Sequence, residues 1–81
     1  GINAEILEIE AKPGSTITKK PIKDVNLPEG VIVGGIFRGD ESYIAMGDFQ
    51  ILPGDRVVVF ALPGTTSKVE KYFQKSMFSL K

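Results

Sequence analysis

Apolar and polar residues alternate near the start of the chain. Between Ala4 and Ala11, Leu7 and Ile9 fall on one face, while Glu8 and Glu10 fall on the other. A period of two predicts a strand with one buried and one solvated face.

A short helical segment is predicted next. The run Pro21–Leu27 begins with a proline that suits a first helical turn, and its apolar residues recur at helical spacing. Pro28 and Gly30 prevent continuation, so the segment holds only one or two turns.

Three further strands follow. Val31–Arg38 and Ser42–Met46 are β-rich runs on either side of Gly39–Glu41, which predicts a hairpin. The Leu52–Asp55 turn introduces Val57–Leu62, which is apolar on both faces. We therefore expect a central strand covered on one side by a helix and on the other by a neighbouring layer or subunit.

The end of the chain has the pattern of an amphipathic helix. Ser67 and Glu70 have the spacing of a capping box. Mostly apolar residues then recur at helical spacing: Val69, Tyr72, Phe73, Ser76, Met77 and Leu80. Such stripes usually pack on a core, so we predict that Tyr72, Phe73 and Met77 are structural rather than part of a cofactor site.

The composition of the chain limits the classes of function that it can have. The 81 residues allow one small domain with a thin core, which favours self-association. Ten basic residues balance ten acidic ones, so nucleic acid is not an expected partner. Histidine and cysteine are absent, and no apolar run approaches the roughly 20 residues of a membrane span. We expect a soluble domain that is not an enzyme.

Glycines and carboxylates offer weak alternatives. Gly34, Gly35 and Gly39 lie in a strand and its hairpin, so they indicate a bulge or a close backbone approach rather than a phosphate loop. Four carboxylates lie in or beside turns, where they bind nearby backbone: Asp40, Glu41, Asp48 and Asp55. A weak hard-cation site is the alternative reading for these four.

Arg38 ends an apolar strand, and strict alternation would place it on the same face as Ile32 and Ile36. It either reaches solvent or clamps a carboxylate of a partner chain or a ligand phosphate.

The order of these pieces resembles a known family. The series Leu27–Gly30, Val31–Asp40, Pro53–Phe60 and Val69–Phe73 is similar to the C-terminal domain of TrkA-type potassium-uptake proteins, over Ala4 to about Phe78. The resemblance implies an α+β fold ordered β-α-β-β-β-α, with an antiparallel-rich sheet and a C-terminal amphipathic helix.

The resemblance also implies a role and partners. Residues 1–81 would be one regulatory domain of a longer chain, homodimeric and attached to a membrane potassium-translocating subunit at the inner face of the cell membrane. NAD or ATP would bind an upstream domain, so no cofactor and no metal are expected here. Alternatives are a purely structural dimerisation or docking lobe, and the equivalent lobe of another ion or dicarboxylate transporter.

Two groups of site residues are expected. A small regulatory ligand would bind at Arg38, Ile36 and Asn26. The dimer interface would involve Val31, Val33, Gly34 and Gly35. Relatives that bind cyclic di-AMP carry an arginine between the first helix and the second strand, and many members have proline where Ala45 or Met46 stands. The connection Asn26–Gly30 has no arginine, which argues against that ligand.

Overall fold

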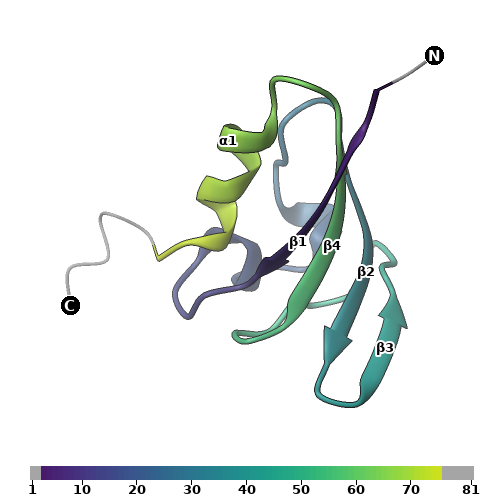
Figure 1. Ribbon diagram of the computed structural model, residues 1–81. Coiled ribbons are helices and arrows are strands. Elements are labelled where there is room, and N and C mark those ends of the chain that lie inside the picture. The colour runs from purple at the N-terminus through teal and green to yellow at the C-terminus, as the bar shows by residue number, and fades with distance from the viewer. Residues whose placement is uncertain (1–2, 76–81) are drawn as a thin grey trace.

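The computed structural model describes residues 3–75 and shows a four-stranded antiparallel sheet covered on one side by a short helix (Figure 1). The strands are β1 (Glu5–Glu10), β2 (Val31–Arg38), β3 (Glu41–Ile44) and β4 (Arg56–Ala61), and the helix is α1 (Thr66–Glu70). Three single 3₁₀ turns complete the elements: η1 (Thr16–Thr18), η2 (Ile22–Asp24) and η3 (Lys71–Phe73). The predicted α+β class is confirmed.

The strand order is β1-β4-β2-β3, so β4 lies inside the sheet as its apolar sequence predicts. Val57 and Val59 of β4 are fully buried on the face that packs against Val69 and Phe73 of the helical segment. Residues outside the sheet complete this core, among them Ile17 of η1, which is also fully buried. The prediction that a helix covers one face of β4 is confirmed. In residues 3–75, the opposite face of β4 is covered by no other element.

A β-bulge changes which residues of β2 share a face. Val33 pairs with Val59 and Gly35 pairs with Val58, so Gly34 is the extra residue. Ile36 and Arg38 therefore lie on the core side, while Ile32 lies on the opposite face. The assignment of all three to one face was wrong, because the alternation of a strand reverses across a one-residue insertion.

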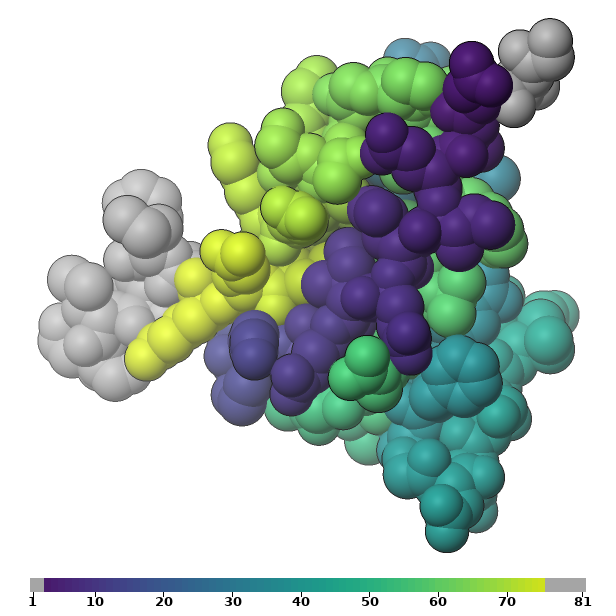
Figure 2. Space-filling model, viewed as in Figure 1, coloured from purple at the N-terminus to yellow at the C-terminus, as the bar shows by residue number. Residues whose placement is uncertain are grey.

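The hairpin between β2 and β3 is tighter than the sequence indicated. Arg38 pairs with Glu41 across Gly39, whose φ of 60° suits glycine, and β3 ends at Ile44. The predicted strand continued to Met46, but the backbone carbonyl of Met46 accepts a hydrogen bond from the Phe49 amide in the following turn. In the space-filling view the hairpin, in teal, projects as a lobe beyond the body of the molecule (Figure 2).

The predicted helix at Pro21–Leu27 is only the 3₁₀ turn η2. The Ile22 and Lys23 amides donate to the carbonyls of Phe49 and Gly47, so this segment is tied to a distant loop rather than extended as a helix. Val25 already has extended backbone angles.

The C-terminal helix is also shorter than its spacing predicted. It begins at Thr66, and neither a side-chain cap nor the Ser67 capping box forms at its start. After η3, Gln74 is extended, the Phe73 carbonyl accepts a hydrogen bond from the Lys12 amide, and Ser15 bridges to Lys75. Backbone pairing with the N-terminal segment thus replaces further helical turns. The predicted stripe residues Ser76, Met77 and Leu80 lie outside the described residues.

Candidate interaction surface

The sheet face turned away from α1, here called the outer face, carries three rows of side chains defined by the strand register. The Phe60 row comprises Ile6, Phe60 and Ile32. The Val58 row comprises Glu8, Val58, Gly35 and Ile44. The Arg56 row comprises Glu10, Arg56, Phe37 and Ser42. Apolar character is therefore concentrated toward one end of the face.

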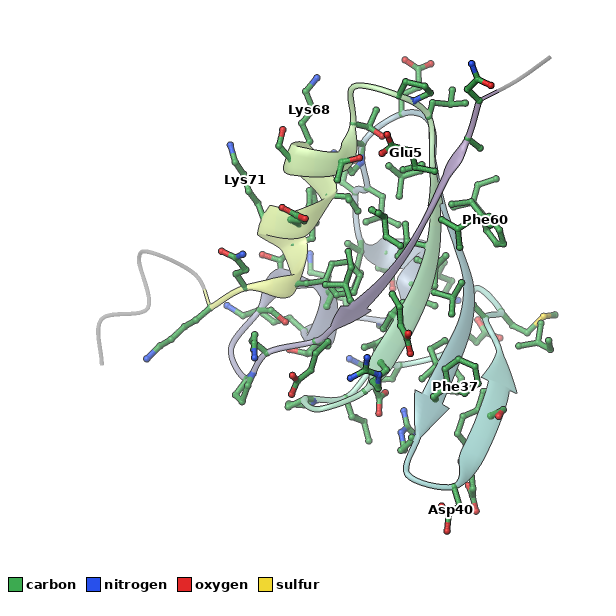
Figure 3. The ribbon with its side chains drawn as sticks, in the orientation of Figure 1. Glu5, Phe37, Asp40, Phe60, Lys68 and Lys71 are labelled. Carbon is green, nitrogen blue, oxygen red and sulfur yellow. The ribbon has the colours of Figure 1, made fainter. Side chains whose placement is uncertain are left out.

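The Phe60 row is apolar on all three strands and open to solvent. Ile6 is 68% exposed, Ile32 66% and Phe60 40%. Figure 3 shows the Phe60 ring pointing away from the side that carries α1. Single exposed apolar residues are ordinary, but a contiguous group on three adjacent strands is typical of an interaction surface.

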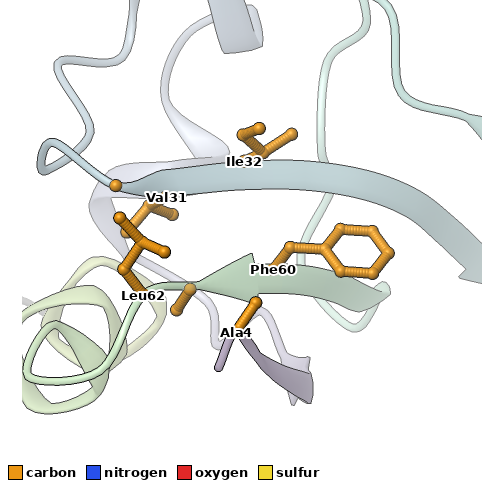
Figure 4. Close-up of a pocket in the computed structure, with 7 residues that line it drawn as sticks. Ala4, Val31, Ile32, Phe60 and Leu62 are labelled. Carbon is orange, nitrogen blue, oxygen red and sulfur yellow. The ribbon is translucent and has the colours of Figure 1, made fainter. Parts of the chain in front are cut away.

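A groove of about 310 Å³ borders this row at the end of the sheet (Figure 4). Its lining is almost entirely apolar: Ala4, Gly30, Val31, Ile32, Phe60, Ala61 and Leu62. Gly30 has a φ of 87°, and because it lacks a side chain it leaves room for the Leu62 side chain, which is 44% exposed. The groove is thus a concave extension of the same apolar face.

The bulge at Gly34 leaves space that the Phe60 ring occupies. A Cβ atom added to Gly34 would lie 2.5 Å from Cε2 of the Phe60 ring, closer than atoms of side chains approach. The ring therefore lies over the glycine backbone, toward the Val58 row. Gly34 thus allows a ring of its own chain to approach the backbone closely.

Charges lie at the other end of the outer face. Nε of Arg56 donates to Oε2 of Glu8 at 2.9 Å, and Nζ of Lys12 bonds Oε1 of Glu10 at 3.2 Å. All four side chains are about half exposed, so these pairs contribute little to stability. They give this end of the outer face both signs of charge.

On the core side, Arg38 is held by its own chain. Its Nε and Nη2 donate to the two carboxylate oxygens of Asp55 at 2.8 and 2.7 Å, and Nη2 also donates to the Gln50 carbonyl at 3.2 Å. The guanidinium lies 5.1 Å from the ring centroids of Tyr43 and Phe49. Arg38 therefore joins the end of β2 to the turn before β4.

Asp55 is the buried partner of this clamp, with only 2% of its side chain exposed. Burial alone would raise the pKa of Asp55, but hydrogen bonds from Arg38 and from the Leu52 amide, with the Arg38 charge, together hold that pKa below its ordinary value. The bond to Asp55 in turn raises the pKa of Arg38. The expected turn role of Asp55 is confirmed by its bond to the Leu52 amide.

The other predicted ligand residues are separate from Arg38. Ile36 is 1% exposed and belongs to the core. Asn26 lines a polar depression of about 320 Å³ whose lining includes neither Ile36 nor Arg38. The Asn26 carbonyl accepts a hydrogen bond from the Tyr72 hydroxyl at 2.7 Å. The three residues do not share one cavity, and their ligand role stays a prediction.

The predicted interface residues divide between the two faces of β2. Val33 is in the core, and Val31 packs against it. Gly34 and Gly35 mark the bulge. The prediction of an interface on this strand stays untested, but its exposed apolar side chains are those of Ile32 and Phe37.

The remaining turn carboxylates do not converge. Asp48 forms an ion pair with Lys23 at 3.0 Å, and Glu41 accepts a hydrogen bond from the Tyr43 hydroxyl. Among residues 3–75, no three acidic side chains are grouped as a metal site would require. Within the same residues, no helix has the length and apolarity to cross a membrane.

The apolar residues on both faces of Val57–Leu62 predicted a second face for a neighbouring layer or subunit. The residues that β2 contributes to this face were not predicted, because strict alternation fails at the Gly34 bulge. The apolar residues on one face of β4 pack under α1, while Phe60 and its neighbours on the other face remain exposed to solvent.

The fold and its surface define a class: a small α+β module with one covered and one open apolar sheet face. Residues 6–74 match the TrkA-C domain family, and the chain belongs to that family. The resemblance seen in the sequence is confirmed.

Similarity to individual proteins supports the same family. The chain is 43% identical over 74 residues to Trk system potassium uptake protein TrkA homolog 1 of Methanosarcina mazei, covering 91% of this chain and 16% of that protein. It is 33% identical over 73 residues to Trk system potassium uptake protein TrkA of Azorhizobium caulinodans, covering 90% of this chain and 16% of that protein. The chain thus spans about a sixth of these relatives.

Proposed function

We propose that this chain is a non-enzymatic regulatory domain of a potassium-uptake system. It acts on the cytoplasmic side of the membrane, pairs with a second copy of itself, and biases the gate of a membrane potassium-translocating subunit. Membership of the TrkA-C family and the names of the relatives support the potassium-uptake setting.

The observation that carries the interaction role is the exposed Phe60 row. A domain of 81 residues has little core to spare, yet three large apolar side chains remain in water on adjacent strands. Covering them with a partner gains the burial that the isolated domain lacks.

Regulation requires that the assembly have two states that a signal stabilises unequally. A small ligand at Arg38 is one such signal, and it would have to compete with Asp55 for the same guanidinium. That competition favours the second candidate function, a docking lobe that transmits changes from other domains and binds no ligand of its own.

A domain exchange tests the proposal. The corresponding segment of the Methanosarcina mazei TrkA homolog 1 is replaced by this chain, and potassium uptake is measured in cells that depend on the chimera. We expect uptake to be restored, and to be lost or deregulated when the segment is deleted. Uptake that is the same with and without the segment would contradict a regulatory role.

Calorimetry separates the two candidates. The 81-residue chain is titrated with nucleotides, cyclic dinucleotides and divalent cations. Heat that disappears in Arg38→Ala, with the fold intact, supports ligand sensing. Absence of heat from every compound supports the docking lobe.

A further inference from the structure

We propose that the open edge of β1 binds an extended, positively charged segment of another protein, which joins the four-stranded sheet as an additional strand beside β1. The added strand would border the helical segment formed by α1 and η3. The site lies on the edge of the sheet rather than on its outer face, so it does not depend on the self-pairing in the proposed function.

The backbone of β1 has unpaired groups on this edge. In residues 3–75 the only strand beside β1 is β4. The Ala11 amide donates to the Asp55 carbonyl at 2.8 Å, and hydrogen-bonded and non-hydrogen-bonded pairs alternate along an antiparallel ladder. Counting back from Ala11, the N–H and C=O groups of Ile6, Glu8 and Glu10 point away from β4. They offer a row of donors and acceptors to an added strand.

A groove of about 310 Å³ borders this edge, and residues of β1 and η3 line it, among them Ile9 and Phe73. The Lys12 amide donates to the Phe73 carbonyl at 2.9 Å, which holds the end of β1 close to η3. In Figure 2, β1, in purple, lies at the front of the molecule beside the yellow-green helical segment. Because side chains alternate along a strand, every second residue of an added strand would point toward this groove.

The carboxylates of the groove select a basic occupant. Glu8, Glu10 and Glu70 line it, together with one lysine, Lys12. Glu8 pairs with Arg56 and Glu10 with Lys12, but both pairs are about half exposed and therefore weak enough to exchange for another cation. Within residues 3–75, Glu70 has no ion-pair partner. A lysine or arginine of the added strand would meet these carboxylates, while its apolar stem covers the apolar part of the groove.

The same charges disfavour other occupants. Pairing two β1 strands would bring their glutamates together, and like charges on facing strands are unfavourable. Glutamates on an edge thus oppose self-pairing while they admit a strand of opposite charge. The other edge, β3, contains only four residues and offers fewer backbone groups.

Titration with short peptides tests the site. The probe is a peptide of alternating arginine and valine, added to the 81-residue chain and followed by NMR. We expect binding that slows hydrogen exchange of the Ile6, Glu8 and Glu10 amides and leaves the amides of β3 unchanged. A peptide of alternating glutamate and valine should not bind. An arginine–valine peptide whose backbone amides are all N-methylated keeps its charge but loses its donors, so it should bind roughly tenfold more weakly or worse.

Charge reversal locates the groove. Glu70→Lys should weaken binding of the arginine–valine peptide by about tenfold or more, because it places like charges together. Asp40→Lys, at the exposed hairpin tip, makes the same change in net charge and should leave binding unchanged (Figure 3). Circular dichroism verifies that both variants fold. Equal weakening in the two variants, or slowed exchange in β3 instead of β1, would overturn the edge site. A wild-type chain that does not bind the arginine–valine peptide would contradict the proposal, whether or not two copies of the chain pair.

Discussion

Arg38 shows how far a single residue can be understood from its place in the sequence. The sequence left Arg38 either to reach solvent or to clamp a carboxylate of a partner chain or a ligand phosphate, whereas the structure supplies a carboxylate from the same chain. The partner, Asp55, lies 17 residues away in a turn, and turn carboxylates are too common to be singled out by sequence. The sequence therefore offered a carboxylate as one kind of partner for Arg38, but not one from its own chain.

The Arg38–Asp55 clamp contributes to stability because Asp55 is buried. Arg38→Ala leaves that carboxylate short of donors, and we expect a loss of about 1–3 kcal/mol in the free energy of unfolding. Arg56→Ala removes an arginine of an exposed ion pair, and should change stability little. Urea denaturation of both variants measures the difference. Equal losses would show that the burial of Asp55 does not matter.

The clamp also predicts the response to acid. The pKa of Asp55 is lowered in the folded state from an ordinary value of 3.8, so the unfolded chain takes up a proton more readily. The stabilisation is fully present above about pH 4 and is lost as the pH falls through the folded-state pKa. The stability difference between wild type and Asp55→Asn should therefore shrink between pH 5 and about pH 2. A difference that is constant over this range would contradict the assignment.

At the scale of elements, strands were predicted well and helices poorly. β1, β2 and β4 follow local periodicity, which a sheet preserves. The ends of the helical segments depend on distant backbone partners, such as the Lys12 amide that binds the Phe73 carbonyl, and no local pattern encodes these. The glycines did indicate a bulge, which is confirmed at Gly34, but its effect on the two faces of β2 was not predicted, because two adjacent glycines carry no side chains that reveal a change of face.

The helical segment is held mainly by Phe73. Its side chain is fully buried with the core valines of β4, so Phe73→Ala should cost about 3–5 kcal/mol, enough to unfold most of a small domain. Gln74→Ala, at an exposed neighbouring position, is the control and should melt like wild type. Thermal melting followed by circular dichroism compares them. A Phe73→Ala variant that melts within a few degrees of wild type would show that η3 does not anchor to the sheet.

The bulge provides a test of how β2 shapes the outer face. Gly34→Ala puts a methyl group into the space of the Phe60 ring, and the ring must turn away. We expect shifted NMR signals of the Phe60 ring and weaker self-association, with the fold retained. Gly35→Ala, whose added Cβ would meet the Tyr43 carbonyl at 3.4 Å and not the Phe60 ring, is the control for the Phe60 signals. Unchanged Phe60 signals in Gly34→Ala would contradict the close contact.

At the scale of the molecule, the two sheet faces have different roles. The inner face is closed by α1, η3 and the loops, and it makes the fold. The outer face adds nothing to the monomer's core, so its apolar residues stabilise the protein only when another surface covers them. If two copies pair as proposed, folding and association are coupled in a domain of this size, because the assembled state gains burial that the monomer lacks.

The proposed pairing predicts that thermal stability depends on protein concentration. Association stabilises the folded chain by mass action, and a hundredfold rise in concentration corresponds to about 2.7 kcal/mol per dimer, or roughly half of that per chain. For a domain of this length, that shift raises Tm by roughly 5–10 °C. Differential scanning calorimetry of wild type from micromolar to hundreds of micromolar should show this rise, while Phe60→Asp should melt at one temperature throughout. A wild-type Tm that is independent of concentration, at concentrations where sedimentation finds dimers, would mean that pairing does not depend on the folded outer face.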